Sequence, residues 1–469
     1  MITRTFLSKC NTIVSDTKDN FGLYPIGMLN HGLITSRILI YFDLENIKPL
    51  FDDGVYTNRS KVKHTLKMFN CGSVDPKRFH DLLISRDTHG IKKRATGFEV
   101  IAFKVPKPWE RGDGFDDSTD KWLIGDAAIS KGGSNWYNSK SGVKWDNEGI
   151  YTQDQLFHEY DKYKNGEESI IICSQDFNYG NENLSLDITD YINDCIDGKV
   201  NNRGICIAFS PVDETSDVDI TQYIGFFTDR TNTYYQPVIE TRYNDSINDD
   251  RYKFTIGKEN RLYLYSDIGG EPKNLDELPV CTIDGKEFEV VHQTKGVYYA
   301  NVTLEKDNYE ADMIVEDIWS NIKYQGYNLD DVEMGFQTHA PESYFKIGKK
   351  ATESLKISVT LNGIKDEEKL NRGEIREVSV GFLQPYMHRK AEITGNVYYK
   401  IYVMDGIKEV NVIDWDEINQ CAGYSYFLID TNGLVPQDYR VDIKVENGRE
   451  TTLYKNELHF KIVNSFSEK

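Results

Sequence analysis

Short strand-like runs recur along the whole chain and limit its fold more than any other feature. In SRILIYFDL, residues 36–44, apolar side chains stand at every second position: Ile38, Ile40, Phe42 and Leu44. Because a strand points alternate side chains to opposite faces, these four are predicted to lie in a core. Similar runs follow along the chain: GFEVIAFKV, ESIIICS, GICIAFS, RLYLYSD, GVYYANVTL, LKISVTL, VYYKIYVMD, YSYFLID, DYRVDIKVE and LHFKIV.

The segments between these runs carry turn signals. Asp-Gly, Gly-Gly and Asn-Gly pairs stand there, as they do in hairpin turns. Thirty Tyr and 22 Phe against 12 Pro also favour strands, because aromatic side chains suit a pleated, half-buried surface. The expected fold class is all-β, with tandem β-sandwiches: a jelly-roll-like domain, then two immunoglobulin-like domains, and few short helices.

Two segments are predicted to be helical. Residues 186–200 place apolar side chains at helical spacing; Asp187 or Thr189 can cap the start, and Gly198 can end the helix. Residues 154–166 form the second candidate and also end in Gly.

Two polar segments without a strand pattern, residues 244–251 and 339–350, suggest domain boundaries. We therefore expect three domains: 1–245, a β-sandwich with insertions; 246–345, an immunoglobulin-like sandwich; and 346–469, a C-terminal sandwich.

The charge balance argues against two classes of partner. The chain holds 55 Lys and Arg against 75 Asp and Glu, a formal net charge of −20. Duplex binding depends mostly on basic side chains at phosphates, so no specific nucleic-acid binding is expected. Anionic membrane surfaces are disfavoured for the same reason.

Cysteine usage and the N-terminal residues suggest where the chain is made. Seven Cys occur singly without a CxxC pair, so we expect reduced thiols and synthesis in a cytoplasm. The first residues show no apolar run of signal-peptide length, and no segment approaches a transmembrane span.

Five segments of the N-terminal half, in order, resemble the DNRLRE-type β-sandwich, a jelly-roll family related to carbohydrate-binding modules. The likeness covers residues 36–243 and implies a sandwich whose loops can hold a glycan. It is interrupted by two insertions, 48–94 and 150–168. The segments are SRILIYFDLENI, GFEVIAFKVPKPWERGDG, SNWYNSKSGVKWDNEGI, LSLDITDYINDCIDGKVNNRGICIAF and IGFFTDRTNTYYQPVIETRY.

Two segments of the C-terminal half are similar to structural virion proteins of tailed phages. EDIWSNIKYQG and the ending GLVPQDYRVDIKVENGRE…ELHFKIV look like parts of the neck and tail proteins of crAss-like phages of gut Bacteroidetes. The resemblance implies small sandwich domains that assemble into a neck or tail.

Three tryptophans are the candidate site residues. Trp109, Trp136 and Trp145 stand in the segments that resemble the binding-module family. An exposed Trp ring can stack on the apolar face of a sugar, but the favoured explanation is that these residues cap the ends of the sandwich or fill an interface.

No motif indicates catalysis, a metal or a cofactor. The nine His lack metal-ligand spacing, and neither a phosphate loop nor a GxSxG motif occurs. The acidic loop GDGFDDSTD, 112–120, has oxygen ligands of the kind Ca²⁺ prefers but not EF-hand spacing. We therefore expect no enzyme activity, no metal and no cofactor.

The expected function is that of a structural virion protein, a neck or tail ring component made in the bacterial host cytoplasm. Its partners would be copies of itself and other neck and tail proteins. The alternative is a glycan-binding module, with a hydrolase third. The 48–94 segment is basic in an otherwise acidic chain, which suggests an arm that docks on an acidic neighbour. Its basic residues include Lys61, Lys63, Lys67, Lys77, Arg78, Lys92, Lys93 and Arg94.

Overall fold

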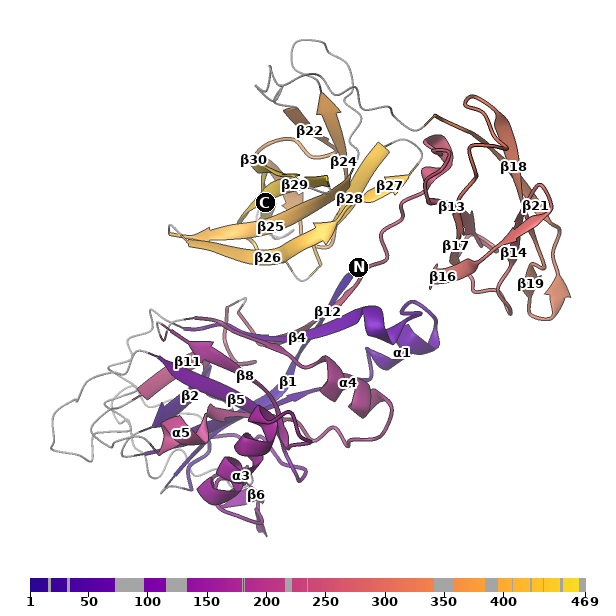
Figure 1. The fold of residues 1–469 in the computed structure, drawn as a ribbon. Helices are drawn as coiled ribbons and strands as arrows, with labels where there is room; N and C mark the ends of the chain where they lie inside the picture. The colour runs from indigo at the N-terminus through magenta and orange to yellow at the C-terminus, as the bar shows by residue number, and fades with distance from the viewer. Residues whose placement is uncertain are drawn as a thin grey trace. The chain divides into compact units, whose positions relative to one another are not determined.

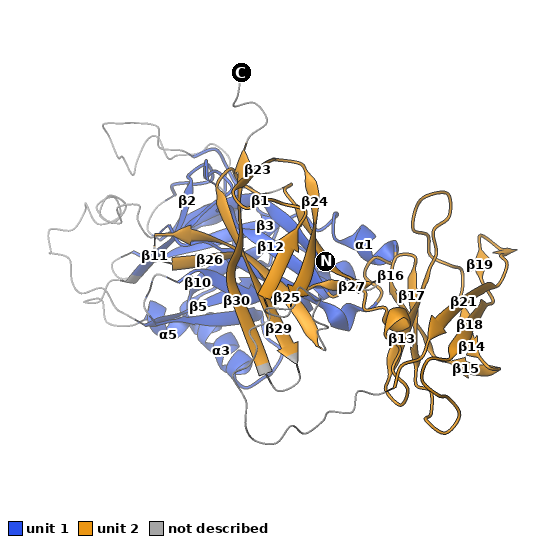
Figure 2. Cartoon of the chain, turned by 90° about the horizontal axis from the view of Figure 1, so that it is seen from above, with its two compact units in different colours: residues 1–53, 58–243 blue, residues 54–57, 244–469 orange. Residues whose placement is uncertain are grey.

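The computed structural model separates the chain into two compact units. Unit 1 comprises residues 1–53 and 58–243, and unit 2 comprises residues 54–57 and 244–469 (Figure 2). The described residues are 1–15, 18–31, 34–71, 97–114, 133–178, 180, 182–215, 222–233, 235–340, 358–383, 395–406, 408–421, 424–432, 434–447 and 450–463.

Unit 1 is built on one large antiparallel sheet with a few short helices (Figure 1). Its strands are β1 (Ile2–Val14), β2 (Ile26–His31), β3 (Ser36–Phe42), β4 (Val62–Met68), β5 (Phe98–Lys104), β6 (Asn138–Lys140), β7 (Val143–Lys144), β8 (Ile171–Phe177), β9 (Leu184–Asp187), β10 (Ile205–Phe209), β11 (Gln222–Phe227) and β12 (Val238–Tyr243). Its helices are α1 (Lys48–Asp52), η1 (Arg59–Lys61), α3 (Gln153–Lys164), α4 (Thr189–Ile196) and α5 (Pro211–Glu214).

The strand order in unit 1 is β8-β5-β10-β3-β1-β12-β4-β9, and β2 pairs with β3 and β11. β1 lies between β3 and β12 and so belongs to both halves of this sheet, β8-β5-β10-β3 and β12-β4-β9. Residues 2–6 pair with β12, residues 7–14 pair with β3, and the register shifts between Leu7 and Lys9. Such a bulge bends a strand, so one strand links the two halves around a common interior.

The two end strands of this order, β8 and β9, are joined by a side chain. The Gln175 amide on β8 donates to the Asn183 carbonyl at 3.0 Å and accepts from the Ser185 N–H at 2.7 Å. Because the described backbones of β8 and β9 do not pair with each other, this side chain supplies hydrogen bonds between them.

Both faces of β3 are buried. Ile38, Ile40 and Phe42 are at most 3% exposed and lie in a cluster that we call the inner core, which also contains Leu29, Leu66 and Ile207. Leu44 packs against this core, as the alternation predicts. The interleaved Leu39 is also fully buried, in a second cluster that we call the outer core. The outer core consists of Ile13, Leu39, Ile101, Phe103, Val105, Trp109, Trp145, Ile150, Leu156, Ile171, Cys206 and Ala208.

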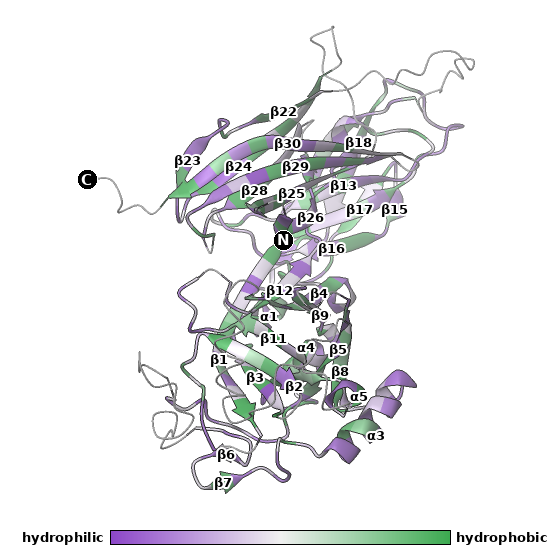
Figure 3. Cartoon of the chain, turned by 90° about the vertical axis from the view of Figure 1, so that its left-hand side faces the viewer, coloured by the Kyte–Doolittle hydropathy of each residue, from purple (hydrophilic) through white to green (hydrophobic). Residues whose placement is uncertain are grey.

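Both predicted helices are confirmed. The N-cap of α4 is Ile188, which makes no side-chain capping bond, rather than the predicted Asp187 or Thr189. The Asp187 carboxylate just before it accepts from the Thr189 N–H at 3.1 Å, and Gly198 follows the helix with φ +72°. In α3, Thr152 and Gln155 form a capping box. Figure 3 shows mainly hydrophilic residues along α3, and its single fully buried side chain, Leu156, joins the outer core.

The expectation that residues 48–94 form a separate basic arm is wrong for residues 62–68. These residues are β4, which pairs with β12 and β9 inside the large sheet. Lys63 and Lys67 therefore stand on a sheet strand, whereas Lys77, Arg78, Lys92, Lys93 and Arg94 lie outside the described residues.

Unit 2 contains two β-sandwiches. Its strands are β13 (Asn260–Tyr265), β14 (Val280–Ile283), β15 (Lys286–Phe288), β16 (Val290–Thr294), β17 (Val297–Val302), β18 (Ile314–Ser320), β19 (Lys323–Tyr324), β20 (Tyr327–Asn328), β21 (Val332–Gln337), β22 (Ser358–Asn362), β23 (Glu368–Asn371), β24 (Ile375–Leu383), β25 (Asn396–Asp405), β26 (Lys408–Glu417), β27 (Asn419–Cys421), β28 (Tyr424–Asp430), β29 (Asp438–Asn447) and β30 (Glu450–Val463), with η2 (Asp250–Tyr252) before them.

The first sandwich of unit 2 has sheets β13-β17-β16 and β15-β14-β18-β21, and its core surrounds the fully buried Trp319. The second has sheets β22-β24-β28-β27 and β23-β30-β29-β25-β26. Here the buried Tyr439 hydroxyl donates to the Val435 carbonyl and accepts from the Val435 N–H, both at 2.9 Å. This is the tyrosine corner of immunoglobulin-like sandwiches. The predicted all-β class with few short helices is confirmed.

Candidate functional site

The three predicted tryptophans lie together in unit 1. Trp109 and Trp145 belong to the outer core and are 3% and 5% exposed, and Trp136 is partly buried and packs against the outer core. A ring that is almost fully covered presents no face to a ligand. This placement favours the packing role that the sequence left open, and ligand contact by these residues stays a prediction.

Residues of the same unit contact both the indole N–H and the ring of Trp109. Its indole N–H donates to the Arg203 carbonyl at 2.9 Å, and the Lys9 ammonium lies 4.4 Å from the ring centroid. Lys9 also donates to the Trp109 carbonyl at 2.7 Å. Burial lowers the pKa of Lys9, an effect that the charge of Glu110 opposes.

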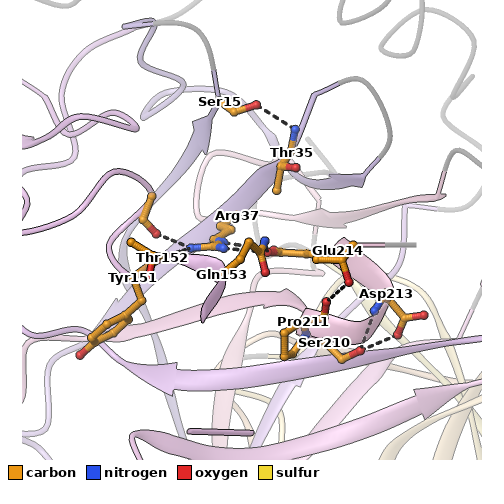
Figure 4. Close-up of polar contacts among 12 residues, drawn as sticks. Ser15, Thr35, Arg37, Tyr151, Thr152, Gln153, Ser210, Pro211, Asp213 and Glu214 are labelled. Carbon is orange, nitrogen blue, oxygen red and sulfur yellow. Dashed lines mark hydrogen bonds and ion pairs between the residues drawn. The ribbon is translucent and has the colours of Figure 1, made fainter. Parts of the chain in front are cut away.

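The most deeply buried charges of unit 1 are Arg37 and Glu214. Their side chains are 1% and 0% exposed, and the guanidinium contacts both carboxylate oxygens, at 3.1 and 2.7 Å. Figure 4 shows the guanidinium between Glu214 and the chain at Tyr151, whose carbonyl accepts at 3.1 Å. Gln153 donates to the same carboxylate. Each nitrogen of the guanidinium and each oxygen of the carboxylate therefore has at least one partner.

Trp136 covers this ion pair. The Arg37 guanidinium lies 5.1 Å from the Trp136 ring centroid, within the range of a cation–π contact. Burial alone would lower the pKa of Arg37, but the charge and hydrogen bonds of Glu214 outweigh it, so the pKa is raised. The guanidinium of Arg37 therefore stays charged, and its contact with Glu214 joins β3 to α5.

A second buried polar cluster holds the loop after Trp109. The Asn20 amide donates to the Arg111 carbonyl at 2.6 Å and to the Ser134 carbonyl at 2.8 Å, and its oxygen accepts from the Gly114 N–H at 2.9 Å. A Cβ on Gly114 would lie 1.9 Å from the Asn20 carbonyl oxygen. The glycines of the Trp-x-x-Gly-x-Gly segment thus allow close packing on Asn20.

The candidate Ca²⁺ loop is only partly described. Gly112 and Gly114 pack on Asn20, whereas Asp116, Asp117 and Asp120 lie outside the described residues. Within the described part of the chain, no group of three or more His, Cys, Asp or Glu residues could hold a metal ion.

His64 is a buried histidine on β4, within the large sheet of unit 1. Its side chain is fully buried, its Nδ1 lies 2.8 Å from the Thr241 hydroxyl, and its Nε2 has no hydrogen-bond partner among the described residues. Burial lowers the pKa of His64 to about 4, against a smaller opposing effect of the Asp187 charge.

We expect unit 1 to lose stability in mild acid because of His64. An unfolded His titrates near about 6.5, so between pH 6.5 and 4 only the unfolded chain takes up this proton. The contribution of neutral His64 to the free energy of unfolding is complete above pH 6.5 and falls by about 3 kcal/mol as the pH reaches 4. Urea unfolding at several pH values should show a shallower fall in His64→Asn. The exposed control His158→Asn should follow the parent chain, and an unchanged slope in His64→Asn would contradict the assignment.

The sequence interpretation missed the Arg37–Glu214 pair. Its partners are 177 positions apart, so no spacing rule could join them. One signal was present. Arg37 lies near the start of a strand whose following residues are nearly all apolar, and a charge in a strand that is buried on both faces needs a buried partner.

No described helix is both long and apolar enough to cross a membrane.

Comparisons with known proteins yield only distant structural likenesses. No protein-family model matches the chain, and no curated protein matches it. The fibronectin type III-like modules of Clostridium thermocellum CbhA share 8% identity over 48% of this chain and 94% of theirs, with a TM-score of 0.16. Titin-A168169 shares 12% over 45% and 94%, with a TM-score of 0.14.

The endo-β-1,4-mannanase of Thermotoga petrophila shares 15% identity over 30% of this chain and 28% of its own length, with a TM-score of 0.17. The aligned region thus spans less than a third of that enzyme. The sheets of the chain itself show that it is an all-β protein of tandem sandwiches. TM-scores this low add nothing to that description.

Proposed function

We propose that this chain is a structural virion protein of a tailed phage, a neck or tail ring component made in the bacterial host cytoplasm. It acts through protein–protein interfaces, and its partners are copies of itself and neighbouring neck and tail proteins. No catalytic residue, metal or cofactor enters this proposal.

The supporting observation is that unit 1 and each of the two sandwiches of unit 2 contain a buried ion pair between separate elements. Unit 1 has Arg37–Glu214. In unit 2, Arg251 contacts the fully buried Asp317, and Lys400 lies 3.4 Å from the fully buried Asp442. The three pairs join β3 to α5, η2 to β18, and β25 to β29.

A buried pair favours one arrangement of strands, because any other arrangement leaves a charge unpaired in the interior. Trp319 adds to this in the first sandwich of unit 2, since its indole N–H donates to Asp317 at 2.7 Å. Sandwiches fixed in this way suit a ring subunit, whose working property is a constant shape.

Protein mass spectrometry of gradient-purified phage particles tests the proposal. We expect peptides of this chain in constant ratio to the portal protein, and genes for portal and capsid beside its own. A chain abundant in the infected cell but absent from washed particles would overturn the proposal.

The alternative, a glycan-binding module, has one observation in its favour. On β28, the rings of Tyr424 and Tyr426 lie 5.3 Å apart, and Tyr424 is 46% exposed. Exposed aromatic faces can stack on sugar rings. A glycan array probed with the full chain and with Tyr424→Ala decides: binding that this change abolishes would favour the alternative.

A further inference from the structure

One face of the large sheet in unit 1 gathers basic side chains around a single carboxylate. The pairing register of β1, β12 and β4 puts alternate residues of the three strands on this face. We call it the basic face, and its residues in three rows are Phe6, Val238 and Lys67; Arg4, Glu240 and Thr65; Ile2, Arg242 and Lys63.

Glu240 is the buried centre of the basic face. Its side chain is 2% exposed and contacts Lys67 at 2.9 Å, Arg242 at 3.0 Å and Arg4 at 3.2 Å. Burial would raise its pKa, but the charges of Lys67, Arg4 and Arg242 outweigh burial and lower the pKa to about 2. Three cations thus surround one carboxylate that stays ionised.

The basic face keeps an excess of positive charge. Lys63 adds a fourth cation, is 60% exposed, and has the half-exposed Asp187 at 3.4 Å. Among the contacts of the described residues, four cations stand beside two carboxylates, in a chain of net charge −20. Phe6, 42% exposed, adds an apolar ring to the same face. An interface commonly has this composition, an apolar anchor with charged groups around it.

A segment of unit 2 has the opposite charge and a similar apolar content. Between β17 and the middle of β18, five exposed carboxylates accompany one Lys. Met313 and Ile314, 41% and 79% exposed, lie among them. We call this segment the acidic face, and its carboxylates are Glu305, Asp307, Glu310, Asp312 and Glu316. Residues 244–340 as a whole hold 20 Asp and Glu against 9 Lys and Arg.

We infer that the basic face of one copy binds the acidic face of a second copy, head to tail. Opposite charges on two different faces attract between copies, and Ile314 and Met313 supply apolar contacts for Phe6. A contact between two different faces leaves one of each free at the ends, so copies add until a ring closes. The inference rests on the proposed function, because it names the partner surface of a ring subunit.

Sedimentation velocity of the full-length chain tests the contact. At 50 mM NaCl we expect species larger than a dimer that grow with protein concentration, and at 500 mM NaCl mainly monomer, because salt screens charges between exposed groups. Wild-type chain that stays monomeric at every concentration overturns the inference. A salt effect that does not depend on concentration also overturns it, because it places the contact within one chain.

Two double variants locate the faces. Lys63→Glu with Phe6→Ser alters only the basic face, and Asp307→Lys with Ile314→Ser alters only the acidic face. Each alone should associate at least about tenfold more weakly than wild type. Mixed in equal amounts, they should form dimers and nothing larger, since one basic and one acidic face remain intact in the mixture.

Lys144→Glu is the matched control, an equal change of charge at an exposed position on β7, and should assemble like wild type. A mixture that stays monomeric while wild type assembles overturns the assignment of these two faces. Circular dichroism of each variant verifies that it is folded. Mass spectrometry of particles tests the proposed function separately, so a failure of this contact is distinguishable from a failure of the virion role.

Discussion

Arg37→Met should lower the free energy of unfolding of unit 1 by about 3–5 kcal/mol, the usual cost of leaving one member of a buried ion pair alone. The change leaves the Glu214 carboxylate, at 0% side-chain exposure, without its bidentate partner. Urea unfolding of the full chain, followed by hydrogen–deuterium exchange in peptides of β3 and β10, measures the loss.

Two further variants separate charge burial from other effects. Arg37→Met with Glu214→Met removes both charges and should recover part of the loss, since apolar side chains of similar size can replace a buried pair. Arg59→Met breaks the exposed pair with Asp197, at 42% and 29% exposure, and should cost at most about 1 kcal/mol. Equal losses in Arg37→Met and Arg59→Met would contradict the buried-pair explanation.

Phe42→Ala should also lower the free energy of unfolding by about 3–5 kcal/mol, because it removes a ring from a closely packed core and leaves a cavity. Phe42 is 3% exposed and belongs to the inner core. The control is Phe6→Ala on β1, 42% exposed, which should change stability by less than about 1 kcal/mol. Denaturant unfolding of the two variants checks the difference, and similar losses would show that Phe42 is not a packed core position.

The inner core could be predicted from β3 because its signal is local. The alternation of Ile38, Ile40 and Phe42 identifies one buried face without any knowledge of the partner strands. The other face was harder to predict. Leu39 is apolar too, and a nearly continuous apolar run is typical of a strand covered on both sides, but the cover comes from distant parts of the chain such as Trp109 and Leu156.

The tryptophans show the limit of the candidate-site prediction. A Trp that stacks on a ligand and a Trp that fills a core have the same identity in the sequence, and their exposure depends on the surrounding chain. Trp109 and Trp145 are covered by their own domain. Lys9, which lies over Trp109, is 100 positions away from it in the sequence. Neither the burial of the two tryptophans nor the Lys9 contact therefore follows from local sequence.

The basic character of residues 61–67 could be predicted from composition, but its geometry could not. From sequence alone, residues 62–68 belong to the basic arm 48–94, because no sequence signal pairs them with β12, which lies far along the chain. The register of that pairing places Lys63 beside Arg242 and brings Lys67 onto Glu240. The charge cluster is therefore a product of sheet topology.

Because β1 pairs with both β3 and β12, part of it cannot complete its pairing during synthesis until β12 has emerged from the ribosome. The amino end of the chain, Ile2 to Phe6, pairs with residues 238–242, so these first residues stay unpaired along that edge until β12 has left the exit tunnel. At an elongation rate of about 5–20 residues per second this wait lasts on the order of tens of seconds. During that time one edge of β1 is open to pairing with nascent chains on neighbouring ribosomes, and a chaperone that binds extended segments would protect the yield of folded protein.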